Sequence, residues 1–324
     1  MVHAVRIHEH GGPEVLRWDE VAVAEPGAGE VRLRQTAIGL NYIDTYHRTG
    51  LYKVPALPAV IGMEAAGVVE SVGPGVTGLK AGDRVAYAGA LGAYAEVRVC
   101  PADRLVVLPD WLDDIQAAAT MLQGMTAEYL LRRTYRVQAG DTILVQAAAG
   151  GTGLLLCQWA NRLGATVIGT VSTEEKAVLA RAHGAHHVIL YSRENFVERV
   201  RELTGGRGVA VVYDGVGQST FLGSLDCLQP RGIMVSFGQA SGAIPPFDTG
   251  LLAAKGSLYL TRPSLFTYTA KREDLLASAA EVFEAIRTGA IKIEVNQTLP
   301  LRDAAEAHRA LEGRTTTGAT VLIP

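Results

Sequence analysis

The chain has 324 residues, of which 48% are hydrophobic and 19% charged, so it is long enough for two domains with a substantial core. Its formal net charge of −3 gives no support for a nucleic-acid or membrane-surface partner. The three cysteines, Cys100, Cys157 and Cys227, lack metal-site spacing, and so sparse a count suggests a reducing compartment. The N-terminus has no apolar region typical of a signal peptide, and no run of 18 apolar residues occurs. We therefore expect a cytoplasmic protein without membrane insertion.

Residues 1 to about 125 are predicted to be mostly β-structure. Short apolar runs, for example at 2–7, 31–37 and 67–72, are separated by breaks rich in glycine and proline. Such spacing is typical of an antiparallel barrel or sandwich. Over 113–133 the apolar residues recur at helical spacing, and a second helix is predicted to follow Gly124.

Residues 141–172 have the pattern of one βαβ unit. An apolar run at 143–145 precedes a turn of small residues, and residues 154–163 are apolar at helical spacing. A second apolar run at 166–171 ends at Ser172. Strand, glycine turn, helix and strand within about 30 residues is the size of a βαβ unit.

The turn inside this unit predicts an anion site. The helix is expected to begin at Thr152 or Gly153, with unsatisfied N–H groups and a positive dipole end. Small residues let a diphosphate approach this backbone. The match to G-x-G-x-x-G is imperfect because alanines stand at the first glycine positions, so a turn that binds nothing is the alternative. The candidate residues are Gly150, Gly151, Thr152 and Gly153.

The end of the second strand selects the dinucleotide. An NAD site usually has an acid there for the ribose 2′-hydroxyl, whereas this chain has Ser172 and Thr173. The small hydroxyls leave room for a 2′-phosphate, which Lys176 can neutralise. Glu174 and Glu175 support NAD, unless they are first-turn residues of the next helix. We expect NADPH as the cofactor.

The rest of the chain alternates strands and helices and then changes character. Predicted helices cover 176–183, 195–204 and 219–228, and predicted strands cover 188–190, 209–214, 232–238 and 257–260. After Pro263 a long amphipathic helix at 272–288, a strand at 291–295, a helix at 301–311 and a strand at 320–323 are predicted. We assign this tail to the first domain; an extension of the nucleotide domain is the alternative.

Several blocks along the chain resemble one known family. They are HGGPEVL (10–16), AIGLNYIDTYHRTGLY (37–52), GMEAAGVVESVGPGV (62–76), KAGDRV (80–85), AAAGGTG (147–153), SLDCLQPRGIMVSFG (224–238) and KGSLYLTRPSL (255–265). In these blocks the chain resembles the medium-chain dehydrogenase/reductase superfamily, and within it the zinc-independent quinone oxidoreductases related to zeta-crystallin. The resemblance implies an α/β protein with a GroES-like β-rich catalytic domain at 1–125 and 266–324. It also implies a Rossmann doubly wound parallel sheet at 126–265, and a homodimer.

The resemblance raises the question of zinc. The alcohol dehydrogenases of this superfamily hold a catalytic zinc with Cys, His and Cys, and the matching positions here are Asn41, Met63 and Gln123. A thioether and two amides do not make such a site, and Glu64 alone does not replace them. The four cysteines of a structural zinc lobe are also missing from the sequence. We therefore expect no metal.

Without a Lewis acid, a quinone is the expected acceptor, since it takes a hydride readily and its oxygens take protons from water. The resemblance implies that Asn41, Asp44, Tyr46 and Tyr52 face the nicotinamide. Asn41 or Tyr46 is a candidate hydrogen-bond donor to the developing quinolate oxygen, whereas Asp44 is expected to orient its neighbours. Core packing is the alternative for the two tyrosines. An enone or alkenal double-bond reductase, with Tyr52 as proton donor, is the alternative function.

The sequence also bears on partners other than a small-molecule substrate. A third hypothesis, a structural or RNA-interacting NADPH-binding protein, lacks the expected basic stripe with interleaved aromatics. The strands at 232–238 and 255–261 are candidates for a shared sheet edge in a dimer, although burial inside the monomer predicts the same pattern.

The resemblance also implies contacts with the dinucleotide besides those of the glycine turn. They are Tyr42, Ile43, Thr45, Tyr129, Ser172, Lys176, Tyr191, Val216, Phe237, Gly238, Ser241, Arg262 and Arg314.

Overall fold

The computed structural model describes residues 1–324 as two compact units. The first contains Met1–Met125, Thr269–Ala280 and Ile293–Pro324, and the second contains Thr126–Tyr268 and Glu281–Lys292. The resemblance implies a first domain that includes all of 266–324. The difference lies mainly in helix α10 (Arg272–Arg287), whose second half belongs to the second unit.

The first unit is built from two sheets. One has the strand order β15-β16-β3-β5-β6-β8, with β7 also paired to β3, and the other has the order β2-β1-β4. All pairings are antiparallel except that of β15 with β16. The strands are β1 (Val2–Ile7), β2 (Leu16–Val21), β3 (Glu30–Leu40), β4 (Ala59–Val60), β5 (Glu64–Val72), β6 (Arg84–Ala88), β7 (Val97–Pro101), β8 (Val106–Val107), β15 (Val295–Pro300) and β16 (Ala319–Ile323). The helices are α1 (Tyr42–Thr49), α2 (Asp114–Ala118), α11 (Ala304–Glu312) and the start of α3 (Met121–Tyr129).

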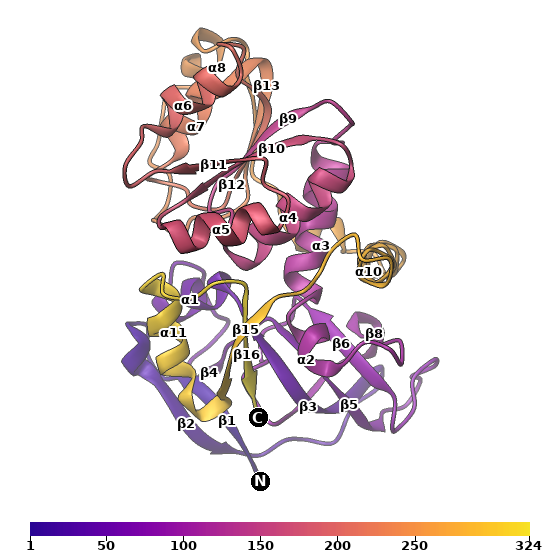
Figure 1. Ribbon diagram of the computed structural model, residues 1–324. Coiled ribbons are helices and arrows are strands. Elements are labelled where there is room, and N and C mark those ends of the chain that lie inside the picture. Colours follow the sequence, from indigo (N-terminus) through magenta and orange to yellow (C-terminus); the bar gives the residue numbers. More distant parts are fainter. The chain divides into compact units, whose positions relative to one another are not determined.

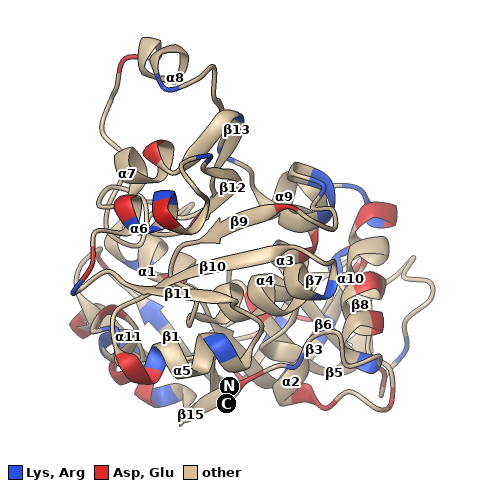
Figure 2. Cartoon of the chain, turned by 45° about the horizontal axis from the view of Figure 1, so that its top comes forward, with Lys and Arg blue, Asp and Glu red and all other residues tan.

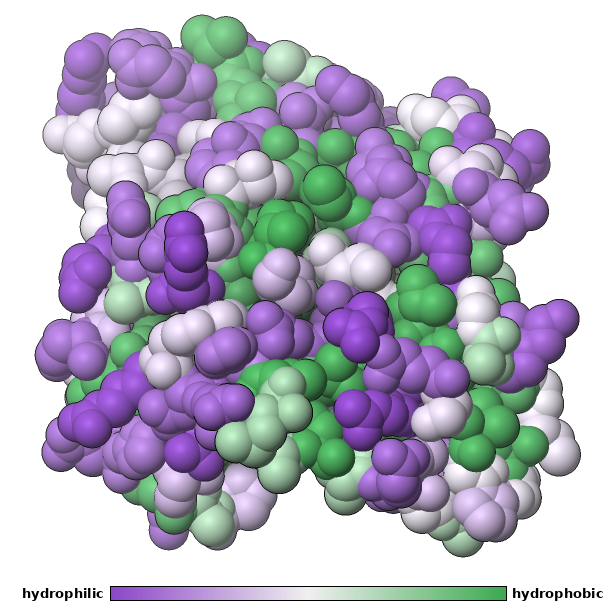
Figure 3. Space-filling view, turned by 90° about the horizontal axis from the view of Figure 1, so that it is seen from below, coloured by the Kyte–Doolittle hydropathy of each residue, from purple (hydrophilic) through white to green (hydrophobic).

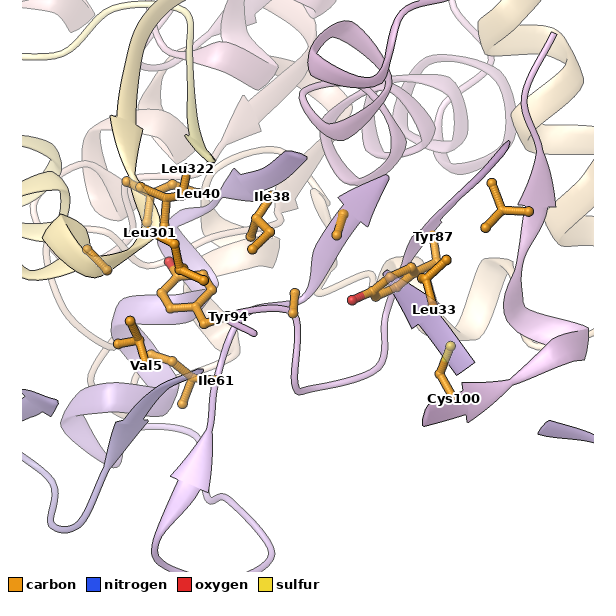
Figure 4. Packing of buried hydrophobic residues seen from close by; sticks show 14 of the residues in the cluster. Val5, Leu33, Ile38, Leu40, Ile61, Tyr87, Tyr94, Cys100, Leu301 and Leu322 are labelled. Atoms are coloured by element: carbon orange, nitrogen blue, oxygen red, sulfur yellow. The ribbon is translucent and has the colours of Figure 1, made fainter. Parts of the chain in front are cut away.

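The C-terminal segment completes the first unit. Strand β16 pairs with the end of β3, with Thr320 opposite Leu40, and Figure 1 shows the yellow C-terminal elements among the indigo N-terminal strands. The core beneath combines residues from both chain ends, and Figure 4 shows Tyr94 between Leu301 and Ile61. Burial of this apolar surface holds the returning segment in place. It therefore brings α11 to the N-terminal strands.

The second unit is a doubly wound parallel sheet. Its strand order is β11-β10-β9-β12-β13-β14, and every pairing is parallel. Helices α4 and α5 pack against one side of the sheet and α6 and α7 lie on the other (Figure 1). The strands are β9 (Thr142–Val145), β10 (Thr166–Val171), β11 (His187–Leu190), β12 (Val209–Asp214), β13 (Leu228–Ser236) and β14 (Tyr259–Thr261). The helices are α4 (Gly151–Arg162), α5 (Glu174–Ala182), α6 (Phe196–Leu203), α7 (Phe221–Asp226), α8 (Gly250–Ala254) and α9 (Leu265–Tyr268), with a π-helical turn at Leu130–Thr134.

The predicted alternation of strands and helices in the second unit is confirmed, and two predictions in the first unit are wrong. The strand predicted at 291–295 is displaced, because β15 (Val295–Pro300) is the segment that pairs with β16, while Ile291 and Ile293 pack as buried side chains without pairing. The predicted helix after Gly124 begins earlier, at Met121, so this glycine lies inside α3. Helix α1 was not predicted, because its apolar residues are few and its eight residues are surrounded by strands.

Candidate active site and coenzyme site

In the first unit, the candidate catalytic residues gather at the start of α1. Asn41 is the N-cap of this helix and forms a capping box with Asp44, whose carboxylate accepts from the Asn41 N–H at 2.9 Å. Both side chains are buried. Residues Tyr42, Ile43 and Thr45 form the first turn, where the Thr45 hydroxyl donates to the Tyr42 carbonyl at 2.7 Å.

The Asn41 amide links α1 to β5 and α3. Its Nδ2 donates to Glu64 Oε2 at 2.6 Å and to the Gly39 carbonyl at 3.4 Å. Its Oδ1 accepts from Gln123 Nε2 at 3.2 Å. Both amide hydrogens are therefore engaged inside the protein, and Asn41 holds the local backbone. These contacts argue against Asn41 as the hydrogen-bond donor to a quinolate oxygen.

Glu64 and Asp44 are two fully buried carboxyl groups on either side of Asn41. Burial raises the pKa of Glu64 to about 8 and that of Asp44 to about 7, although hydrogen bonds from Asn41 work in the opposite direction. Glu64 Oε1 also accepts from the Leu122 N–H at 2.6 Å. At neutral pH Glu64 is therefore mainly protonated, and Asp44 is near its midpoint.

The positions that match zinc ligands in alcohol dehydrogenases meet in this same network. Asn41 and Gln123 are hydrogen-bonded to each other, and Met63 is buried next to Glu64. No group of three or more His, Cys, Asp or Glu side chains is placed to hold a metal ion. The donor set of two amides and a thioether does not fit Zn²⁺, which prefers thiolate, imidazole and carboxylate ligands.

Tyr42 and Tyr46 of α1 form an aromatic group with Tyr52, which follows the helix. The rings of Tyr46 and Tyr52 meet edge-on with centroids 5.1 Å apart, and the Tyr42 and Tyr46 centroids are 5.8 Å apart. Tyr46 is buried, whereas Tyr52 is half-buried. Tyr46 thus has the packed surroundings foreseen as the alternative, and Tyr52 keeps more of its surface open.

In the second unit, the glycine turn forms a bare helix N-terminus. Helix α4 begins at Gly151, and its N-cap Gly150 makes no side-chain capping bond. A Cβ on Gly153 would come within 2.3 Å of the Ala147 carbonyl oxygen, so this position requires glycine. Uncapped N–H groups and a close backbone approach are what a diphosphate needs. The turn therefore fits the predicted anion site.

The end of β10 carries no acid directed at a ribose. Thr173 caps α5 and accepts from the Lys176 N–H at 3.3 Å, and Lys176 itself is half-buried in the first turn. Glu174 also lies in that first turn, with its carboxylate 3.0 Å from Arg193. Glu174 and Glu175 are thus first-turn residues of α5, the reading compatible with NADPH. The Tyr191 N–H donates to the Val171 carbonyl at 3.2 Å and brings this exposed tyrosine beside Ser172.

The loops after β12 and β13 are held together by Asp214, a residue that the sequence analysis missed. Its Oδ1 accepts from the N–H groups of Val216 at 2.8 Å and Gly217 at 3.0 Å. The Ser241 hydroxyl donates to the Val216 carbonyl at 2.8 Å, and the Phe237 N–H donates to the Asp214 carbonyl. The acid at the end of the apolar run VAVVYD was the available signal. These loops lie at the carboxyl ends of the strands, where open α/β sheets bind ligands.

The remaining predicted cofactor residues have varied surroundings. Tyr129 is buried and stacks on Tyr268 with centroids 4.4 Å apart. Arg262 donates to the carbonyls of Ser236 and Gly238, and so supports the end of β13. Arg314 is exposed, in the first unit, with a φ of 58°. The structure thus brings the candidate residues together in two sets, one in each unit.

Comparison with family models agrees with the two folds. Residues 27–110 match the model described as alcohol dehydrogenase GroES-like domain, and residues 151–279 match the one described as zinc-binding dehydrogenase. A GroES-like unit with a dinucleotide-type sheet defines a dehydrogenase or reductase of the medium-chain superfamily. The predicted fold class is therefore confirmed.

Individual relatives narrow this class. The chain is 55% identical over its full length to the full length of a quinone oxidoreductase of Pseudomonas aeruginosa. It is 51% identical to an Escherichia coli quinone oxidoreductase solved with NADPH, with a TM-score of 0.98 over 99% of this chain and 100% of that one. It is also 50% identical, over 100% of its length and 99% of the relative's, to a 2-haloacrylate reductase of a Burkholderia species. The chain belongs to the quinone oxidoreductase family of the medium-chain dehydrogenases/reductases.

Proposed function

We propose that the protein is an NADPH-dependent quinone reductase that works without a metal ion. The observation that carries this proposal is the Gln123–Asn41–Glu64 network, which occupies the positions of the zinc ligands in alcohol dehydrogenases with groups unsuited to zinc. The full-length similarity to quinone oxidoreductases supports the same acceptor. The first unit then serves as the catalytic domain and the second as the NADP-binding domain.

The second unit fits NADPH through its backbone and one cation. The bare N-terminus of α4 receives the diphosphate, and Gly153 allows it to approach. Ser172, Lys176 and Tyr191, which follow the ends of β10 and β11, would hold the 2′-phosphate. Asp214 keeps the Val216 loop in the shape that supports the nicotinamide end. When bound, NADPH supplies the hydride.

The first unit positions and shields the acceptor. The half-buried Tyr52 and its neighbour Tyr46 offer aromatic surface to a planar quinone and hydroxyl groups to its oxygens. Asn41 and Asp44 hold the start of α1, the helix that carries Tyr46 and precedes Tyr52 in the chain. The proton that quinone reduction requires beyond the hydride comes from water.

A steady-state assay with a simple benzoquinone, using NADPH and NADH in turn, tests this function. We expect turnover with NADPH and a clear preference for it, because the end of β10 lacks an acid for the NAD ribose. No turnover with any quinone, or a strong preference for NADH, would refute the proposal. Replacement of Tyr52 by Phe is expected to lower the rate only modestly, since a quinolate also takes its proton from water.

A second candidate function is the reduction of an activated carbon–carbon double bond. The relative from Burkholderia named as a 2-haloacrylate reductase is the observation that favours it. Here a proton must reach the α-carbon, and Tyr52 is the candidate donor. Tyr52→Phe should then abolish reduction of an enone while leaving quinone reduction. Equal loss of both activities would remove this candidate.

We also propose a homodimer and a cytoplasmic location. Strand β14 is the edge of the six-stranded sheet, and Tyr259 on it is 63% exposed. An exposed apolar edge strand is a template for pairing with a second copy. All three cysteines are free and buried, which fits a reducing compartment. No helix has the length and apolar character needed to cross a membrane.

A further inference from the structure

A line of buried polar side chains connects the start of α1 with the surface of α11. Asp44, Tyr94, His308 and Arg48 are all at most 1% exposed, and Glu312 at the end of the line is partly exposed. All five belong to the first unit. Tyr94 comes from the segment between β6 and β7, and His308 from the returning C-terminal helix. Nothing in the reaction proposed above uses Tyr94, His308 or Arg48.

The contacts along this line are short and continuous. The Tyr94 hydroxyl lies 3.1 Å from Asp44 Oδ2 and 2.9 Å from His308 Nε2. One terminal nitrogen of Arg48 lies 2.9 Å from His308 Nδ1, and the guanidinium donates two bonds, of 2.7 and 2.9 Å, to the Glu312 carboxylate. The Arg48 Nε also donates to the Gly11 carbonyl at 3.1 Å. Each group therefore has a fixed neighbour on either side.

Arg48 sets the direction of every hydrogen bond in the line. A guanidinium only donates, so His308 Nδ1 accepts and its proton resides on Nε2. Nε2–H then donates to the Tyr94 oxygen, and the Tyr94 hydrogen points to Asp44. Burial and the nearby Arg48 lower the pKa of His308 to about 3, which keeps it neutral, and burial raises the pKa of Tyr94 well above its usual value. The line orients groups but does not conduct protons to solvent, because Arg48 does not release its protons.

This order has a consequence for the two oxygens of Asp44. Oδ2 accepts from the Asn41 N–H at 2.9 Å and from the Tyr94 hydroxyl, whereas buried Oδ1 has no hydrogen-bond partner. A proton on Asp44 therefore resides on Oδ1. The Tyr94 hydroxyl stabilises the ionised carboxylate in the same way as the Asn41 N–H does.

We propose that Tyr94 and His308 are positioning residues of the reductase: they hold Asp44, and through it the Asn41 capping box and the tyrosines of α1, in the arrangement that the reaction uses. The expected loss of rate rests on the proposed function. The expected change in the titration of Asp44 does not depend on it. The other titratable and charged groups around Asp44 are Glu64 of β5, across Asn41, Tyr87 of β6, which makes no hydrogen bond to it, and His47 and Arg48 of its own helix.

The experiment compares Tyr94→Phe, His308→Phe and His308→Gln with a matched control, Tyr87→Phe. Tyr87 is another fully buried tyrosine of the first unit, and its hydroxyl donates to Gln35 without touching the line. Gln retains an acceptor and a donor at a spacing similar to that of the imidazole nitrogens, so it can replace His308, whereas Phe cannot. Rates with NADPH and benzoquinone are measured against pH. The carbon-13 shift of the Asp44 carboxyl, assigned with Asp44→Asn, is followed without substrate.

We expect Tyr94→Phe to raise the Asp44 midpoint by about one pH unit, because the ionised form loses a hydrogen bond. We expect kcat to fall roughly three- to tenfold with the KM for NADPH unchanged. His308→Phe should act in the same direction and His308→Gln should restore most of the effect, while Tyr87→Phe lowers stability without moving the midpoint. An unmoved midpoint in Tyr94→Phe, or an equal shift in Tyr87→Phe, would overturn the inference. Absence of quinone turnover in the unmodified protein would instead refute the proposed function, since the carboxyl titration needs no substrate.

Discussion

Lys176 is the residue on which the choice of coenzyme depends most directly. It lies half-buried in the first turn of α5, beyond a strand end that carries only small hydroxyl residues. We expect Lys176→Ala to raise the KM for NADPH roughly 10- to 100-fold, because a charge-assisted bond to the 2′-phosphate is lost. The KM for NADH should change little. Steady-state kinetics with both coenzymes measure this, and equal effects on the two would remove Lys176 from the site.

The buried acids Asp44 and Glu64 predict an unusual dependence of stability on pH. Their pKa values in the folded state, about 7 and about 8, lie above the ordinary values of 3.8 and 4.5. The folded state therefore binds protons more tightly than the unfolded state, and this contribution to stability is lost as the pH rises from about 5 to 8. Each group contributes up to about 1.4 kcal/mol per pH unit in that window.

Chemical denaturation at pH 5 to 8 measures this effect in Asp44→Asn and Glu64→Gln. Each variant should gain stability relative to the unmodified protein as the pH rises, since an amide has no charge to bury. Asp19→Asn is the matched control, because His8 and Arg6 lower the pKa of the half-buried Asp19, and its relative stability should not rise with pH. If the relative free energies of unfolding of all three variants changed in the same way from pH 5 to 8, the raised pKa values of Asp44 and Glu64 would be contradicted.

At the scale of the element, helix α4 requires a glycine in its first turn. A Cβ at Gly153 would lie 2.3 Å from the Ala147 carbonyl oxygen, whereas one at Gly150 would lie 3.4 Å from the same atom. We expect Gly153→Ala to weaken NADPH binding at least tenfold, because the backbone that faces the diphosphate must shift. Titration of NADPH by fluorescence measures the dissociation constant, and Gly150→Ala should cause a smaller loss. Equal dissociation constants for the two variants would show that the turn does not contact the phosphates of NADPH.

At the same scale, elements with strong local patterns were predictable. The strands predicted at 166–171 and 209–214 have the same bounds as β10 and β12. A continuous apolar run between two turns is typical of a buried parallel strand and fixes both of its ends. Helix α1 was missed, although the Asn41–Asp44 capping box was a signal at its start. The strand at 291–295 was wrong, because pairing with β16 decides which residues extend.

For the whole molecule, the exposed edge of the second unit predicts the oligomeric state. Leu260 and Tyr259 project from β14, which has a partner on one side only. Leu260→Lys should convert a dimer into monomers, because a charged edge strand resists pairing. Light scattering after size exclusion measures the mass of the particle. Leu222→Lys is the control, because Leu222 is an exposed leucine of α7, away from the sheet edge. A monomeric unmodified protein would contradict the dimer.

The surface of the whole chain gives little support to a nucleic-acid partner. Basic and acidic residues are interspersed along the helices in Figure 2, and in the face of Figure 3 the apolar residues form small groups bordered by polar ones. Together with the net charge of −3, this distribution lacks the basic stripe that backbone phosphates require.

The sequence by itself determined the features that depend on neighbouring residues: the βαβ unit, the glycine turn, the acid-free end of β10 and the poor zinc ligands at three positions. Local backbone preferences and short-range hydrophobic patterning decide these. The tertiary structure decided which distant groups meet. It turned the Asn41 amide inward to Glu64 and Gln123, and it placed His308, more than 200 residues from Tyr94, on the same hydroxyl. Such contacts come from packing the returning C-terminal segment against the N-terminal strands, and no pattern along the chain encodes the distance between them.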